Sequence, residues 1–400
     1  MAMRKVCFCL FILMSCLPPL SLEAKPKAKH PEIPILAWFS IPDGKYATKE
    51  QYQALKDCGF TLSFSHIYTY EGAMRALNLC AKVGMKSIFM CPELEKKPEE
   101  TVRKVKKHPG LGGYFLRDEP QNDAMKALGE WARRIQSVDK KHPCYLNLLP
   151  VQGMPEGTYK EHLRLFNELT PLPQLSYDHY PVKANEKGEV NLNTTFYQNL
   201  EMVAAEGKRT EKPFWAFALS TAHGSYPIPT IEHLRLQMYS NLAYGAQVLQ
   251  YFTYWNPGTE TWDFHQAPVT AEGLRSTVYE LVREFNQEIQ QRAFVWAGCK
   301  MESVFHLGEN IPKGTSRLTT LPPHFNQLSV EKGSILISTL TNGSKHYIQV
   351  VNTSPSQSAQ FRLVTDNKVS LVRRDGSRQQ ASLYDSLHIL APGDTEIYGY

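Results

Sequence analysis

Between Ile33 and about Gln291, short apolar runs alternate with amphipathic stretches, and this alternation restricts the fold more than any other feature. It is typical of repeated β-α units around a parallel sheet. About eight strands and eight helices in about 260 residues match a (β/α)8 barrel in length and order. The candidate strands are Ile35–Phe39, Leu62–His66, Ser87–Cys91, Gly113–Arg117, Cys144–Leu148, Gln174–Asp178, Phe214–Leu219 and Gln247–Tyr254.

An open, doubly wound sheet is the main alternative. When such a sheet binds nucleotides, its first turn is usually rich in glycine. The segment from Phe39 to Gly44, after the first candidate strand, is not. We therefore predict an α/β fold of the (β/α)8 (TIM) barrel type.

After about Arg292 the pattern changes to short β-rich runs separated by Gly, Asn, Asp and Pro. This change predicts an antiparallel β-sandwich of about 100 residues. We expect residues 30–295 to form the barrel and residues 296–400 to form a small sandwich that packs on it as a scaffold. The runs are Met301–Leu307, Leu328–Val330, Ser334–Leu340, His346–Asn352, Phe361–Val364 and Leu387–Leu390.

The N-terminus has the pattern of an export signal. Arg4 and Lys5 precede an apolar run, 6–17, which is too short to span a membrane. Cleavage after Ala24 would release a protein without residues 1–24. Alternatively, residues 13–16 resemble a bacterial lipobox, which would leave Cys16 lipidated. Both alternatives predict an exported protein, either periplasmic or lipid-anchored at the bacterial cell envelope.

Charge and cysteine content exclude some classes of site. A net charge of +5 over 400 residues is too small to indicate nucleic-acid binding. The histidines at 66, 179 and 223 have no metal-ligand spacing, so we predict no metal and no cofactor. The cysteines outside the signal segment are scattered and lack metal spacing, and we expect buried free thiols at Cys58, Cys80, Cys91, Cys144 and Cys299.

Aromatic and acidic residues follow the candidate strands, where the active sites of barrels lie. This mixture suits a carbohydrate, because aromatic rings stack on sugar faces and carboxylates handle hydroxyl groups and the glycosidic proton. We expect Trp131 and Trp296, in contrast, to be core residues. The candidate substrate-binding residues are Trp38, His66, Tyr68, Glu93, Arg117, Asn147, Tyr177, His179, Tyr180, Tyr254 and Trp255, and the candidate catalytic residues are Glu119, Asp178 and Asp118.

The segment from Gly112 to Pro120, GGYFLRDEP, is the most specific motif. It runs an apolar strand directly into three charged residues, which is costly at a barrel mouth unless the charges are paired or used. The motif resembles the fourth strand of glycoside-hydrolase barrels similar to the β-galactosidase-like enzymes of clan A. That resemblance implies that Glu119 is the acid/base, and a barrel followed by a sandwich is also common in that clan.

Two departures from the clan leave the second catalytic group open. The clan has a nucleophilic Glu at the end of strand seven, but residues 213–220 contain no carboxylate. Asp118 also replaces the Asn that precedes the acid/base in the clan. We rank Asp178 first as the partner carboxylate. A substrate-assisted route through Asp118 is second, because the Asp-Glu pair resembles that of hexosaminidases, and residues 176–180 and Trp255 resemble parts of chitinase-type barrels. Glu93 ranks third, with Glu260 and Asp263 as further candidates.

The orientation of Asp118 is a further open point. Strand alternation places Arg117 and Glu119 on one face and Asp118 on the other. We expect the turn at Pro120 to bring Asp118 into the site, where its charge would raise the pKa of Glu119.

The leading hypothesis is a glycoside hydrolase. A barrel that binds carbohydrate without catalysis is the alternative, favoured by the missing strand-seven Glu. A barrel enzyme of different chemistry, such as a lyase or deacetylase, is less consistent with the motifs. The sequence indicates no nucleic-acid partner, allows membrane attachment through Cys16, and leaves the oligomeric state open.

The export hypothesis predicts the mass of the mature protein. Intact-mass spectrometry should find an N-terminus at Lys25 if the signal is released, or a lipidated Cys16 if the protein is anchored. A protein that keeps Met1 after expression in a secreting bacterial host would contradict both alternatives.

Overall fold

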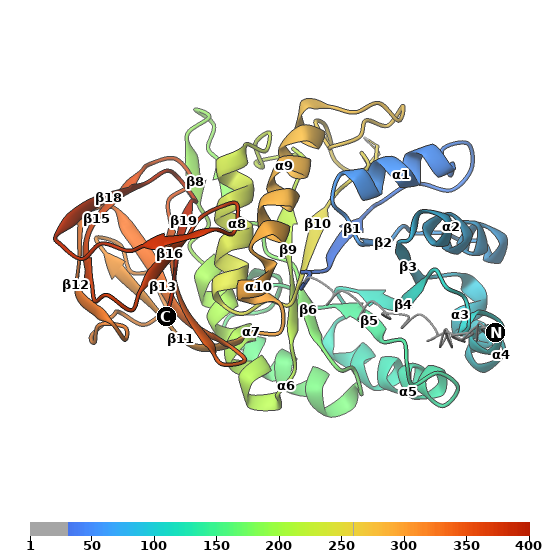
Figure 1. Cartoon of the computed structure of the whole chain (residues 1–400). Helices are drawn as coiled ribbons and strands as arrows, with labels where there is room; N and C mark the ends of the chain where they lie inside the picture. Colours follow the sequence, from blue (N-terminus) through green and yellow to red (C-terminus); the bar gives the residue numbers. More distant parts are fainter. Residues whose placement is uncertain (1–30, 259) are drawn as a thin grey trace, which may run out of the picture. The chain divides into compact units, whose positions relative to one another are not determined.

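The computed structural model describes residues 31–258 and 260–400, and the predicted signal segment and Cys16 lie outside these ranges (Figure 1). Among the described residues, no helix is long and apolar enough to cross a membrane. The five cysteines that we expected to be free are buried and unpaired.

The first part of the described chain is the predicted barrel. Its eight strands are all parallel to their neighbours, in the order β5-β4-β3-β2-β1-β10-β9-β6. The barrel prediction is therefore confirmed over the open-sheet alternative, with each candidate strand at its expected place. The strands are β1 (Ile35–Trp38), β2 (Leu62–Ser63), β3 (Lys86–Phe89), β4 (Leu111–Asp118), β5 (Cys144–Asn147), β6 (Leu175–Tyr177), β9 (Phe214–Leu219) and β10 (Val248–Phe252).

The barrel closes between β5 and β6 through a narrow seam. A single parallel bridge joins Leu148 to Tyr177, with the Leu148 amide donating to the Ser176 carbonyl at 2.7 Å. The side-chain amide of Gln174 donates to the Cys144 carbonyl at 2.8 Å and spans the same seam.

Helices connect the strands, and local capping explains where several begin and end. The Thr48 side chain accepts from the amide of Gln51, and Gly84 ends its helix with φ +72°, which favours glycine. Pro98 starts a new helix directly after Lys97, so two short helices lie between β3 and β4. The helices are α1 (Lys49–Asp57), α2 (Tyr70–Val83), α3 (Pro92–Lys96), α4 (Pro98–Val105), α5 (Met125–Gln136), α6 (Tyr159–Leu169), α7 (Phe196–Thr210), α8 (Ile231–Ala243), α9 (Thr277–Gln291) and α10 (Ala293–Trp296), with 3-10 turns at Asn122–Ala124 and Val151–Gly153.

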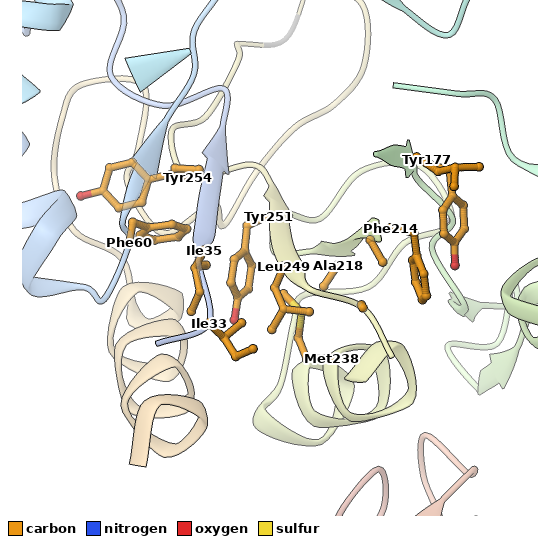
Figure 2. Packing of buried hydrophobic residues seen from close by; sticks show 14 of the residues in the cluster. Ile33, Ile35, Phe60, Tyr177, Phe214, Ala218, Met238, Leu249, Tyr251 and Tyr254 are labelled. Atoms are coloured by element: carbon orange, nitrogen blue, oxygen red, sulfur yellow. The ribbon is translucent and has the colours of Figure 1, made fainter. Parts of the chain in front are cut away.

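The main core lies between the strands and these helices. Figure 2 shows Ile35, Leu249 and Met238 packed together in this layer, and Tyr177 and Tyr254 also belong to it. The barrel interior holds a separate, largely aromatic cluster. A short hairpin, β7 (Val182–Ala184) with β8 (Val190–Leu192), follows β6 and was not predicted.

The C-terminal part forms the predicted sandwich. Its sheets have six strands, β11-β13-β14-β19-β16-β17, and three strands, β12-β15-β18, with an apolar cluster between them. The six predicted runs are all strands, and three further short strands were missed. The strands are β11 (Lys300–Gly308), β12 (Phe325–Lys332), β13 (Ser334–Asn342), β14 (Lys345–Asn352), β15 (Ala359–Thr365), β16 (Ser370–Val372), β17 (Arg378–Gln380), β18 (Ser386–Leu390) and β19 (Thr395–Gly399).

Helix α8 joins the two parts, because it is buried on every side from His233 to Ala243. One side faces the barrel strands and another faces β13 and β14, as the close approach of these elements in Figure 1 indicates. The Ser338 hydroxyl donates to the Ala243 carbonyl at 2.6 Å, and the indole of Trp296 donates to Gln349 at 2.9 Å. Leu336 belongs to the same apolar cluster as the barrel residues. The sandwich therefore covers the barrel, and the exact boundary at 295/296 stays a prediction.

This shared core predicts unequal costs for two leucine truncations in the sandwich. Leu336→Ala should lower the free energy of unfolding by about 2–4 kcal/mol, because it leaves a cavity against the barrel. Leu387→Ala should change it by less than about 0.5 kcal/mol, because Leu387 is exposed. Urea denaturation of both variants measures the difference, and equal costs would contradict the scaffold role.

Candidate functional site

A pocket of about 550 Å³ opens at the carboxyl ends of the barrel strands. Larger cavities, of about 840 Å³ beside α6 and α7 and about 640 Å³ on the sandwich, lie away from these strand ends. Active sites of (β/α)8 barrels lie at the strand ends, so we place the candidate site in this pocket. It is lined by Trp38, Phe39, His66, Asp118, Glu119, Asn147, Pro150, Gln152, Asp178, Tyr180, Phe217, His223, Tyr226, Phe252, Pro257, Gly258, Glu260, Thr261, Trp262 and Phe264.

A β-bulge in β4 brings Asp118 into this pocket. The pairing of β4 with β5 shifts between Phe115 and Arg117, so that Asp118 lies opposite Asn147. The extra residue reverses the inside–outside alternation, because a bulge changes which face the following side chains point to. Our expectation that the turn at Pro120 would reorient Asp118 is therefore corrected, since the change occurs within the strand.

Glu119 reaches the same pocket through an unusual backbone. Its φ is +43°, in the left-handed region that non-glycine residues rarely adopt. The Glu119 amide donates to the Asn147 carbonyl at 2.8 Å, which anchors this conformation to β5. Phe39, after β1, also has a positive φ of +45° and lines the same pocket. Such strain concentrates at functional sites, where the surrounding structure enforces it.

Three carboxyl groups meet at the pocket floor, and burial raises the pKa of each. Burial is the largest cause of the raised pKa of Glu119. Burial and then the charges of Glu119 and Asp118 raise the pKa of Asp178 well above its ordinary value. Burial and the Glu119 charge, opposed by a hydrogen bond from Asn147, raise the pKa of Asp118 to about 7. Burial and mutual repulsion therefore favour the protonated forms of these carboxyls over the ionised forms.

Asn147 connects two of these carboxyls. Its side-chain amide nitrogen donates to Asp178 at 2.8 Å and to Asp118 at 3.2 Å. Its amide oxygen accepts from the Ser176 hydroxyl at 3.0 Å. Asn147 is nearly inaccessible to solvent, so its orientation is determined by these partners.

Aromatic rings form the walls of the pocket. Tyr180 stacks on Phe252 with ring centroids 5.9 Å apart, and His223 packs against Phe264 at 4.6 Å. Trp262, with 57% of its surface exposed, lies next to His223 at the rim. Among the lining residues that the structure describes there is no Lys or Arg. The pocket therefore combines apolar faces with hydrogen-bond acceptors, as a sugar requires.

The structure brings together part of the predicted site. Trp38, His66, Asn147, Tyr180 and the three predicted catalytic carboxyls line the pocket. Tyr68 and Arg117 line an adjoining cavity of about 390 Å³, which shares His66 and Asp118 with the pocket.

Other predicted residues lie away from the pocket. Tyr177, Tyr254 and Trp255 are in the core between strands and helices, and Trp255 packs on Tyr46. His179 is buried, and its ring bonds to the Thr195 hydroxyl at 2.9 Å. Glu93 lies exposed on α3 and is not among the lining residues.

The sequence analysis did not select several lining residues, chiefly Phe39, Gln152, Tyr226, Trp262 and Phe264. Most lie on loops beyond the strand ends. There, the number of residues after a strand does not predict whether a side chain reaches the pocket. The aromatic run near the Asn256-Pro257-Gly258 turn was the available signal for Trp262 and Phe264. Within the described ranges, no group of three or more His, Cys, Asp or Glu side chains has an arrangement that could hold a metal ion.

Comparison with known proteins gives one family match. Residues 125–292 match the family model described as Beta-galactosidase, of glycoside hydrolase family 42. No curated protein sequence matches this chain.

Solved structures share the fold at low sequence identity. A β-galactosidase from Bacillus circulans sp. alkalophilus has a TM-score of 0.63 and 10% identity, over 93% of this chain and 99% of that chain. A catalytic mutant of Gan42B, a GH42 β-galactosidase from G. stearothermophilus, has a TM-score of 0.61 and 8% identity, over 92% and 98%. The β-galactosidase from the psychrophilic Marinomonas ef1 has a TM-score of 0.49 and 10% identity, over 65% of this chain, which spans only 60% of that enzyme.

The raised pKa of Asp118 predicts a pH-dependent stability. The native state holds this proton up to about pH 7, whereas the unfolded chain releases it near the ordinary value of 3.8. The native state thus binds more protons between these values, so this contribution to stability is present at low pH and is lost as pH rises through 7. Asp118→Asn should therefore gain roughly 2–4 kcal/mol in unfolding free energy over the native protein between pH 4 and pH 8.

Urea denaturation across this pH range measures the gain. Asp57→Asn, which changes an exposed carboxylate on α1, is the matched control and should follow the native protein. A difference between Asp118→Asn and native protein that does not change with pH would contradict the raised pKa.

Proposed function

We propose that this protein, a glycoside-hydrolase-type barrel similar to the clan A β-galactosidases, hydrolyses glycosidic bonds with Glu119 as general acid/base. The observation that carries this proposal is the placement of Glu119 and Asp178 in one aromatic-walled pocket at the carboxyl ends of the barrel strands. Glycosidases need one carboxyl that is protonated near neutral pH and a second that is ionised. Glu119 and Asp178 can divide these two roles between them.

The two carboxyls differ in access, which supports different roles. Glu119 is the more accessible of the two, whereas Asp178 is half-buried and accepts a hydrogen bond from Asn147. In the proposed first step, Glu119 gives its proton to the glycosidic oxygen as the bond from this oxygen to the anomeric carbon breaks. The Asp178 carboxylate attacks that carbon and forms a glycosyl-enzyme bond. Water then attacks the same carbon, loses a proton to Glu119 and releases Asp178.

The link between Asp178 and Asp118 through Asn147 favours this retaining route. Inverting enzymes hold their carboxyls roughly 6.5–9.5 Å apart to admit a water molecule, and retaining ones about 5–5.5 Å apart. One amide nitrogen, that of Asn147, donates both to Asp178 and to Asp118, the neighbour of Glu119, and this favours the shorter, retaining separation. In this proposal Asp178, after β6, is the nucleophile. A nucleophilic Glu at the end of β9, as in clan A, is then not required.

A substrate-assisted route is the second candidate mechanism. Asp118 lies in the pocket beside Glu119, where it could orient an N-acetyl group that attacks the anomeric carbon. The hexosaminidase- and chitinase-like features of the sequence stay a hypothesis on this point. We also propose that the protein is exported, on the strength of its N-terminal charge and apolar pattern.

The decisive experiment is a screen of aryl glycosides, starting with β-galactosides, on native protein and Glu119→Gln. Loss of the general acid should lower kcat/KM at least about a hundredfold. Glu93→Gln is the matched control, since Glu93 is exposed and outside the pocket, and it should keep native activity. Asp178→Asn should be as impaired as Glu119→Gln if Asp178 is the nucleophile.

The outcomes separate the hypotheses. Equal cleavage by native protein and Glu119→Gln would contradict the assigned role of Glu119. A requirement for an N-acetyl group in the substrate, with Asp118→Asn inactive, would favour the substrate-assisted route over Asp178. Sugar binding by calorimetry without release of new reducing ends would favour a carbohydrate-binding barrel that lacks catalysis.

A further inference from the structure

A chain of hydrogen bonds crosses the barrel interior beneath the carboxyl groups. The Tyr145 hydroxyl donates to Gln250 Oε1 at 2.7 Å, and Gln250 Nε2 donates to Ser176 Oγ at 2.9 Å. The Ser176 hydroxyl donates to Asn147 Oδ1 at 3.0 Å, and Asn147 Nδ2 donates to Asp178 and Asp118. Every bond in the chain donates toward the carboxyls.

The members of this chain have little freedom to rearrange. Tyr145, Ser176 and Gln250 have no exposed surface, and Asn147 has almost none. They come from β5, β6 and β10, so the chain crosses the barrel from wall to wall. Buried polar groups that are mutually satisfied strengthen one another and fix a single arrangement.

The direction of the chain determines which end of the Asn147 amide faces the carboxyls. An amide has a donor end and an acceptor end of nearly equal size, and only its partners decide between them. Because Ser176 donates to the oxygen, the nitrogen is left to donate to Asp178 and Asp118. A reversed amide would place its oxygen against two carboxyl oxygens, which would repel their ionised forms.

We propose that Tyr145, Gln250 and Ser176 form a one-way relay that holds Asn147 as a donor to Asp178 and Asp118, and that Ser176 and Gln250 are positioning residues of the site. None of these three residues lines the pocket, so they act only through Asn147. The relay favours the ionised forms of Asp178 and Asp118, which accept from Asn147, and so favours Glu119 as the carboxyl that carries the proton. Its effect on catalysis rests on the proposed function, whereas its effect on carboxyl titration does not.

Other titratable groups also face the carboxyls and must be kept constant in a test. They are Glu119 on the β4 loop, His66 after β2, Tyr180 after β6, His223 and Tyr226 after β9, and Glu260 after β10. No variant in the test changes any of them.

The test compares Ser176→Ala with Ser63→Ala. Ser63 is a buried barrel-strand serine whose hydroxyl bonds to Ser40 at 2.9 Å, and it has no link to Asn147. The infrared band of protonated carboxyl groups, recorded from pH 4 to 9, should show its midpoint raised by about 0.5–1 pH unit in Ser176→Ala, because the amide is free to reverse. Ser63→Ala should titrate like the native protein.

The kinetic readout uses the aryl glycoside that the native protein cleaves. For Ser176→Ala, kcat should fall about tenfold with KM within about twofold, and the acidic limb of the pH profile should move up with the infrared midpoint. Gln250→Met should raise the infrared midpoint and lower kcat as well, but by smaller amounts, because Ser176 can still donate to Asn147. This variant also serves as the test if Ser176→Ala does not fold.

Each result has a distinct meaning. A carboxyl midpoint in Ser176→Ala and Gln250→Met equal to that of Ser63→Ala would overturn the relay. A raised midpoint in a native protein that cleaves no glycoside would support the relay while contradicting the proposed function.

Discussion

The seam between β5 and β6 is the constraint on which both the barrel and its site depend. Other neighbouring barrel strands pair along ladders of backbone residues, but this joint has a single bridge, at Leu148 and Tyr177. Side-chain hydrogen bonds reinforce this joint. Asn147, the last residue of β5, bonds to Ser176 within β6 and to Asp178 just after β6. The contacts that close the barrel at this seam therefore also hold Asp178 close to Asp118.

The electrostatic character of the pocket follows from that assembly. Three carboxyls meet where the described lining residues include no Lys or Arg, so protonation, favoured by the raised pKa values, rather than ion pairing limits their repulsion. The carboxyls accept hydrogen bonds, while the tryptophan, tyrosine, histidine and amide side chains of the lining can donate them. The hydroxyl groups of a sugar can pair with both, and the aromatic walls accept the apolar ring faces.

Sequence patterns predicted the order of strands better than the direction of side chains. Apolar periodicity located all eight barrel strands, because burial between two layers requires it. β17 was missed because its residues, Arg378 to Gln380, are all exposed and carry no such pattern. Trp255 and Tyr254 follow a strand as Tyr180 does, yet they lie in the outer core. Proximity to a strand end does not specify the face, and the bulge that turns Asp118 inward leaves no mark in the sequence.

Helix α8 also has a consequence for the order of events during synthesis. Its two buried sides belong to partners made at different times, since β9 and β10 flank it in the chain while β13 and β14 come later. At roughly 5–20 residues per second, the roughly 90 residues between α8 and β13 take several seconds to emerge. During that interval the outer side of α8 is an uncovered apolar surface on a nascent chain. A chaperone that binds such surfaces would therefore meet this protein at α8, and the sandwich, once complete, would displace it.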